Sequence, residues 1–149
     1  MIRKALTDDV VRITEIQIFG WRVAYRNIIK DDILFSERTV INSINRTKDN
    51  ILNKITDTYV YDDSGIIKGF MIIGPLRDED SEFSFELYAI YVDPCFLHHG
   101  IGSKLLKKCE SIALEKNIRI IKIWTFISNI TGRKFYEKLK FLVFFLSFS

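Results

Sequence analysis

Residues 86–106, ELYAIYVDPCFLHHGIGSKLL, are the stretch that decides the fold. The first half is apolar and stops at Val92-Asp93-Pro94, which predicts a strand that ends at the proline. The second half is a short polar loop, then Gly100-Ile101-Gly102 and an amphipathic run, which predicts a helix that begins at the glycines. Glycine lets a ligand approach the backbone, and the first helical turn has unpaired N–H groups at the positive end of the dipole. The stretch therefore predicts a phosphate-binding loop between a strand and a helix.

A Gly-x-Gly pair at such a junction could also do no more than turn the chain. The nucleoside triphosphate loop Gly-x-x-x-x-Gly-Lys-Ser/Thr is absent from the sequence. The third glycine of the dinucleotide fingerprint is missing too, because position 105 is leucine. These two classes of nucleotide-binding protein are excluded.

Three motifs resemble the GNAT superfamily of acetyl-CoA-dependent N-acetyltransferases. The first is Val92-Asp93-Pro94 followed by Leu97-His98-His99-Gly100-Ile101-Gly102, which is similar to the family's Val-x-Pro and Gln/Arg-x-x-Gly-x-Gly/Ala. The second is residues 129–141, NITGRKFYEKLKF, which resemble Asn-x-x-Ala-x-x-Phe-Tyr-Glu-Lys-x-Gly-Phe. The third and weaker one is Trp21-Arg22-x-Ala24-Tyr25, similar to an acceptor-side helix of small bacterial members. The resemblance covers nearly the whole chain.

The hydrophobic pattern predicts one domain, residues 1–149, of the α/β (α+β) class around one mixed sheet. A strand at 2–6 is followed by a helix that Thr7 caps, and then by a helical region at 31–53 that is broken near Ser36. The remaining expected elements, in order, are a hairpin at 57–61 and 66–74, a strand at 83–92, a helix at 100–116, a strand at 119–126, a helix at 129–139 and a strand at 141–148. The resemblance implies a mostly antiparallel sheet, flanked by helices and splayed at the cofactor site between the strands of Val92 and Trp124. It also implies that the family's final strand is missing here.

Composition limits the classes of function. The chain has 149 residues, 48% of them apolar and 28% charged, and a net charge of +3, which suits one globular domain and is too mild to indicate nucleic acid binding. No apolar run is long enough for a signal peptide or a membrane span, so we expect a cytoplasmic protein with no membrane partner. Cys95 and Cys109 are expected to be packing residues in a reducing compartment.

The resemblance implies acetyl-CoA as cosubstrate. Backbone N–H groups at the helix start are expected to hold its pyrophosphate, and strand backbone its pantetheine arm and thioester oxygen. Leu97 departs from the family's Gln or Arg, so that side chain cannot contact phosphate. The two histidines could add charge there or be solvated, and we expect no metal because no third ligand is evident. The expected cofactor-binding residues are Ile90, Tyr91, Val92, His98, His99, Gly100, Ile101, Gly102, Ser103 and Asn129.

Two residues are predicted to be catalytic. Tyr136 is the expected general acid, because a phenol stays protonated at neutral pH and can give its proton to the leaving thiolate. It could also be only a packed aromatic residue. Glu86 is the expected base, directly or through a water, although it could instead be an exposed strand residue or a ligand for a cationic acceptor. Aromatic residues that could line the acceptor pocket or only fill the core are Trp21, Tyr25, Tyr88 and Trp124.

The leading hypothesis is an N-acetyltransferase that passes acetyl to a primary amine of a small molecule or peptide by direct attack in a ternary complex. The alternatives are a non-catalytic acetyl-CoA-binding or sensing module of the same fold and, third, a structural or interaction protein. The sequence does not identify the acceptor. The segment at 141–148 is uncharged and apolar, and an edge strand of this kind left open would promote aggregation. We therefore expect it to pair in a homodimer or to be buried between neighbouring strands.

Overall fold

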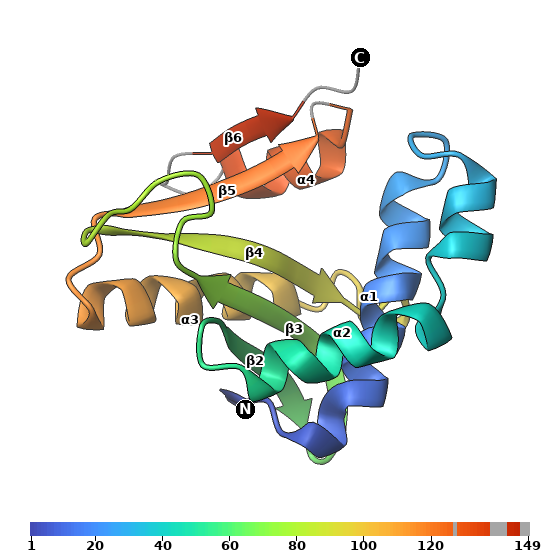
Figure 1. Cartoon of the computed structure of the whole chain (residues 1–149), viewed down its shortest axis with the longest axis horizontal. Coiled ribbons are helices and arrows are strands. Elements are labelled where there is room, and N and C mark those ends of the chain that lie inside the picture. Colours follow the sequence, from blue (N-terminus) through green and yellow to red (C-terminus); the bar gives the residue numbers. More distant parts are fainter. Residues whose placement is uncertain (127, 138–142, 147–149) are drawn as a thin grey trace.

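The computed structural model describes residues 1–126, 128–137 and 143–146. The sheet has six strands whose spatial order follows the chain, β1-β2-β3-β4-β5-β6 (Figure 1). Their bounds are β1 Ile2–Lys4, β2 Asp57–Asp63, β3 Ile66–Gly74, β4 Ser84–Val92, β5 Ile120–Phe126 and β6 Val143–Leu146. The strands β1 to β4 are antiparallel to one another in successive pairs. β5 is parallel to β4, and β6 is parallel to β5. The predicted mixed, mostly antiparallel sheet is confirmed.

Helices cover both faces of this sheet. One core joins inward side chains of β3, β4 and β5 to α3, Ile101–Glu115, and α4, Ile130–Glu137, lies against the same core. The opposite core joins other side chains of β2 and β3 to α1, Val10–Tyr25, which is next to α2, Val40–Leu52 (Figure 1). The predicted apolar stripe of α3 is buried in full, at Ile101, Leu105, Cys109, Ile112 and Ala113. The helix predicted to reach residue 139 is helical to Glu137, and 138–139 lie outside the described residues.

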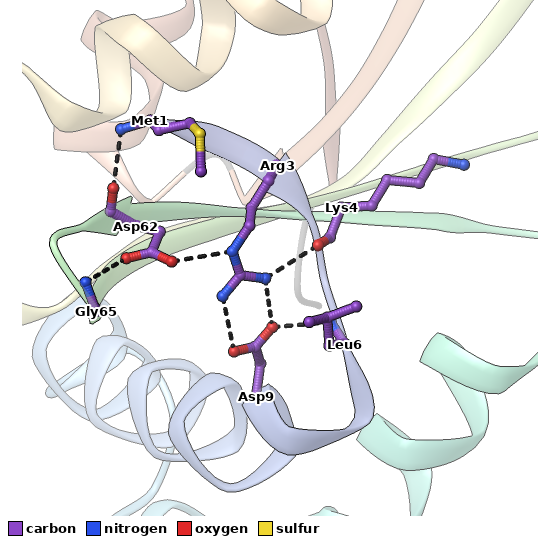
Figure 2. Close-up of polar contacts among 7 residues, drawn as sticks. All are labelled: Met1, Arg3, Lys4, Leu6, Asp9, Asp62 and Gly65. Carbon is purple, nitrogen blue, oxygen red and sulfur yellow. Dashed lines mark hydrogen bonds and ion pairs between the residues drawn. The ribbon is translucent and has the colours of Figure 1, made fainter.

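The first helical region begins differently from the prediction. Thr7 is not a cap: it starts the 3-10 turn η1, Thr7–Asp9, ahead of α1. The Asp9 carboxylate accepts the Leu6 N–H at 2.8 Å and both ends of the Arg3 guanidinium, which also donates to Asp62 at 2.9 Å (Figure 2). A carboxylate with several fixed donors satisfies the turn better than a hydroxyl can. Arg3 thereby ties β1 to η1 and to the β2–β3 hairpin.

The end of α1 and the break in the next helical region agree with the sequence analysis. α1 continues through Trp21 to Tyr25, so the Trp21-Arg22-x-Ala24-Tyr25 motif is helical, as its resemblance to an acceptor-side helix implies. A short π-helix, η2 (Ile33–Glu37), precedes α2. In the first turn of α2, the backbone N–H of Asn42 donates to the Thr39 hydroxyl at 3.2 Å. The break therefore falls at a residue that caps the next helix.

The last described strand lies at an edge of the sheet. β6 pairs with β5 and ends the strand order, so the expectation that it is buried between neighbouring strands is wrong. Of the predicted strand at 141–148, residues 141, 142, 147 and 148 lie outside the described residues.

Candidate functional site

Strands β4 and β5 separate part-way along their length. They pair from Ser84 with Ile120 to Leu87 with Ile123, but β4 continues to Val92, where it still pairs with β3 at Gly69. Within the described part of the chain, the β5-facing backbone groups at 88–92 have no ladder partner. The splay implied by the resemblance is therefore present, and the predicted contacts Ile90 and Tyr91 lie on it with Val92.

A β-bulge lies where the separation starts. Consecutive β3 residues Ile72 and Ile73 face Ala89 and Leu87, so Tyr88 is an extra residue in β4. A bulge bends its strand and increases the local twist, which explains why β4 leaves β5 at this point. The Tyr88 hydroxyl donates to the carbonyl of Pro75 at 2.5 Å and fixes the bulge to the end of β3.

The loop after β4 is anchored before it reaches the glycines. Asp93, 6% exposed, accepts the N–H of Cys95 at 2.8 Å and a guanidinium N–H of Arg12 at 2.5 Å. Burial raises the pKa of Asp93, but these donors outweigh it and the net pKa is lowered. Arg12 also donates to the carbonyl of Ile67, so α1, β3 and this loop are joined by one side chain. The sequence prediction missed Arg12, because nothing local in the sequence links it to Asp93.

The helix that follows has an uncovered N-terminus. Gly100 is its N-cap with φ +77° and no side-chain cap, and the Lys104 N–H donates to the Gly100 carbonyl at 3.0 Å. The N–H groups of Gly100 to Ser103 precede this first helical bond and have no intrahelical partner. Ile101 is buried, which holds the helix in the core, whereas the residues around the glycine are exposed: His98, His99, Gly100 and Ser103.

His98 adopts φ +64° in this loop. A non-glycine residue pays a steric cost in the left-handed region, and such strain gathers at ligand sites. Gly100, with φ +77°, is a second residue in this conformation, and loops of this kind can present backbone N–H groups to an anion. The predicted phosphate-binding residues are thus together in one loop, and Leu97, 39% exposed, adds no polar group.

Side chains from both faces of the sheet meet at the splay. Tyr25 comes from α1, Tyr91 from β4 and Tyr136 from α4, and we call these three residues the tyrosine cluster. Burial raises the pKa of Tyr136 well above its usual range, with further contributions from Tyr25 and Cys109. Burial also raises the pKa of Tyr91, to which Tyr25 and Tyr136 add. Three phenols that influence one another's ionisation lie close together and remain protonated at neutral pH.

Two further residues hold the tyrosine cluster. Trp21 lies near enough to Tyr91 to lower the pKa of that phenol, against the larger effect of burial. Gly20 lies directly against the Tyr91 ring, since a Cβ there would be 2.7 Å from Cδ1 of that ring. The sequence analysis missed Gly20, although an isolated glycine inside a helical pattern is a signal of close packing.

Asn129 caps α4 beside the same cluster. Its Oδ1 accepts the N–H of Gly132 at 3.0 Å and its Nδ2 donates to the Thr125 hydroxyl at 3.4 Å. Burial raises the pKa of Tyr25, while hydrogen bonds to Asn129 and Tyr91 lower it, so the amide also touches the tyrosines. A Cβ at Gly132 would be 2.5 Å from Nδ2, which explains why a glycine stands in the motif here.

The Glu86 carboxylate is buried and hydrogen-bonded, not open to solvent. It is 0% exposed and lies opposite Lys122 on the face of the sheet that carries Tyr88. Both of its oxygens accept from Arg77: Oε2 from the backbone N–H at 3.1 Å, and Oε1 from the guanidinium Nε at 2.9 Å. Glu86 is therefore not the exposed strand residue considered as an alternative; it anchors the β3–β4 loop through Arg77.

Other chemistries find little support in the described residues. Burial raises the pKa of the Cys109 thiol to about 12, so it is inert, and Cys95 is exposed and unbridged. Within 1–126, 128–137 and 143–146, no group of three His, Cys, Asp or Glu side chains could hold a metal ion. No described helix combines the length and the apolar character that a bilayer crossing requires.

Comparison with known proteins decides the family. A sequence model of the acetyltransferase (GNAT) family matches residues 24–141. The chain belongs to the GNAT family of acetyltransferases. This GNAT chain is 28% identical to the N-acetyltransferase YuaI of Bacillus subtilis, over 86% of its own length and 72% of the relative. It is 26% identical to a spermidine N(1)-acetyltransferase of Thermoplasma acidophilum, over 95% and 88% of the two chains.

Solved structures share the fold of this GNAT protein. The PaiA N-acetyltransferase of Thermoplasma acidophilum, in complex with coenzyme A, superimposes with a TM-score of 0.80 at 22% identity, over 93% of this chain and 86% of that one. YncA of Salmonella typhimurium, solved with acetyl-CoA, gives a TM-score of 0.68 at 22% identity, over 94% and 78%. One neighbour thus holds coenzyme A and the other holds acetyl-CoA, the cosubstrate that the resemblance implies.

Proposed function

We propose that this GNAT protein transfers the acetyl group of acetyl-CoA to a primary amine of a small molecule or peptide in a ternary complex. The observation that carries the proposal is the splay: unpaired β4 backbone, an uncovered helix N-terminus and partly buried phenols lie along one opening. The cofactor complexes of the structural neighbours support the same use of the fold.

Binding uses mainly backbone. N–H groups at 98–103 would hold the pyrophosphate at the positive end of the α3 dipole. The free edge of β4 at Ile90, Tyr91 and Val92 would pair with the pantetheine amides as an added strand does, and one of its N–H groups would face the thioester oxygen as negative charge develops there. Asn129 would contribute its amide from the other side of the opening.

The chemical step moves one acetyl group and balances its protons. The amine nitrogen attacks the carbonyl carbon, the carbon–sulfur bond breaks, and Tyr136 gives its proton to the leaving sulfur. Because the pKa of Tyr136 is raised, the phenol is protonated throughout the neutral range. The proposed base is Glu86 acting through a water, with its carboxylate held in position by Arg77.

Release of free thiol from acetyl-CoA with a panel of amines tests the function. We expect turnover with at least one primary amine, and calorimetric binding of coenzyme A in the micromolar range typical of KM values. Tight cofactor binding with no turnover for any amine would favour the alternative, a non-catalytic sensing module. Absence of coenzyme A binding would contradict both. Glu86→Gln should lower turnover while Asp57→Asn, another strand carboxylate, should not.

We also propose that the chain is one domain, that it acts in the cytoplasm and that it forms a homodimer through β6. One continuous sheet supports the first proposal, and two free cysteines support a reducing location. β6 lies at a sheet edge, where unpaired backbone groups invite a second strand. Light scattering tests the dimer, and a monomer at micromolar concentration would contradict it.

A further inference from the structure

A small cavity lies between α1 and α2, on the acceptor side of the sheet. Its volume is about 20 Å³, room for only one or two water-sized groups. The cavity cannot take a whole acceptor molecule, but it can take a small polar end of one. The lining residues are Gln17, Ile18, Trp21, Arg38, Ser43 and Arg46.

The polar lining is chemically one-sided. Arg38 and Arg46 are permanent cations with several N–H donors, and the amide of Gln17 and hydroxyl of Ser43 can also donate. No carboxylate lines the cavity. Neither arginine is in an ion pair with an acidic side chain in the part of the chain that the structure describes. The cavity thus offers donors and positive charge with no anion of its own.

One arginine is already oriented. The guanidinium carbon of Arg38 lies 4.5 Å from the centroid of the Trp21 ring, a stacked cation–π geometry that limits its motion. A guanidinium held in this way keeps its fork of N–H donors available for a planar carboxylate. The limited volume favours a carboxylate over a larger phosphate.

The cavity shares a wall with the tyrosine cluster. Trp21 lines the cavity and contacts Tyr25, a member of the tyrosine cluster. The Trp21 and Tyr25 ring centroids are 4.9 Å apart on the same helix. A molecule with one end in the cavity therefore lies one indole ring away from the phenols where the thioester is expected.

We propose that this cavity binds a carboxylate of the acceptor, so that the preferred acceptor is an amine that also carries a carboxylate, as in an amino acid or peptide. The inference rests on the proposed acetyl transfer and names its substrate class. With this preference the chain would differ in acceptor from an enzyme that accepts only polycationic amines.

The test uses straight-chain ω-amino acids of increasing length, each beside its amide, in the thiol-release assay. At the length that spans cavity and thioester, kcat/KM for the acid should exceed that for the amide by about tenfold or more, the value of one charge-assisted contact. Arg38→Gln and Arg46→Gln should raise KM for the acid and leave kcat and the amide unchanged. Arg26→Gln is the matched control, because this exposed arginine pairs with Asp31 and does not line the cavity.

Equal kcat/KM for acid and amide at every length, or equal losses for both in the arginine variants, would overturn the inference while leaving acetyl transfer intact. Hexanoate, which has the carboxylate but no amine, should inhibit competitively against the amino acid; noncompetitive inhibition would mean an effector site and would also overturn it. If no amine releases thiol, the proposed function fails separately. The cavity is then judged by thermal shift: hexanoate must stabilise the native protein beyond the effect of coenzyme A alone, and must add nothing to that effect in Arg38→Gln.

Discussion

On the α3 side of the splay the candidate ligand contacts are backbone N–H groups, whereas on the α1 side they are side chains from separate elements. The α3 side depends on the conformations of His98 and Gly100, which are two residues apart in one loop. The α1 side depends on Trp21 and Arg38, which come together only when α1 packs beside η2 and α2. A site made of backbone leaves a short, regular trace of glycines in the sequence, and a site made of side chains does not.

The largest effect should come from the residue at which the two sides meet. Tyr136→Phe removes one proton donor and almost no volume, so turnover should fall about 10² to 10⁴-fold while coenzyme A affinity is kept. Tyr59→Phe, which removes a hydroxyl from β2, is the control and should have no effect on turnover. Since the pKa of Tyr136 is raised, the wild-type pH–rate profile should show no loss assignable to this phenol below pH 10. An unchanged rate in Tyr136→Phe would remove this residue from the mechanism.

Gly100→Ala tests the backbone-made side. Its φ of +77° is unfavourable for alanine, and Gly65, with φ +91°, is the matched control, because a Cβ at either position meets no atom within 4 Å. Both substitutions should therefore cost about 1 kcal/mol of stability. Coenzyme A affinity, measured by calorimetry, should fall about tenfold or more in Gly100→Ala alone. Equal affinities in the two variants would mean that the loop does not hold the cofactor.

Gly20→Ala tests the side made of side chains. Helix propensity alone would make this substitution stabilising by up to about 1 kcal/mol, but the new Cβ would lie 2.7 Å from the Tyr91 ring. We expect no gain in melting temperature and a several-fold loss of turnover as the ring is displaced. Combining it with Tyr91→Leu should recover the melting temperature and not the turnover. A more stable, fully active Gly20→Ala would show that Tyr91 tolerates movement.

The smallest effect on turnover should come from the N-terminal network of Figure 2, which includes none of the residues assigned to either side. Hydrogen bonding to Arg3 lowers the pKa of Asp9, so the carboxylate stabilises the fold above its unfolded pKa of about 3.9, and this contribution is lost as the pH falls through the lower folded value. Asp9→Asn should cost about 2 kcal/mol at pH 7 and flatten the acid limb of stability. The control Asp57→Asn breaks the exposed Lys4 pair and should cost under about 0.5 kcal/mol. Denaturant titrations at pH 3 to 7 measure both, and equal losses would contradict the assignment.

What could be predicted from the sequence follows the same division. The stripe of α3 and the β2–β3 hairpin follow from periodicity and turn residues, so their positions were correct within a residue or two. Thr7 was predicted as the cap because the preference for a hydroxyl residue before a helix can be read from neighbouring residues alone. In the structure Asp9 accepts the Leu6 N–H instead, and Arg3 of β1 holds the Asp9 carboxylate in place. The pairs Arg12–Asp93 and Arg77–Glu86 and the contact of Gly20 with Tyr91 depend on tertiary packing, to which no spacing in the chain corresponds.

The sequential strand order has a consequence for how the protein is made. The strands β2, β3 and β4 each pair antiparallel with the strand just before them in the chain, and these ladders need no segment beyond Val92. Parallel β5 must wait for the crossover through α3, and β6 for the crossover through α4. Local pairings close sooner than distant ones during synthesis. A nascent chain therefore completes its antiparallel half first, and the opening between β4 and β5 forms only after β5, Ile120–Phe126, has been synthesised and has paired with β4.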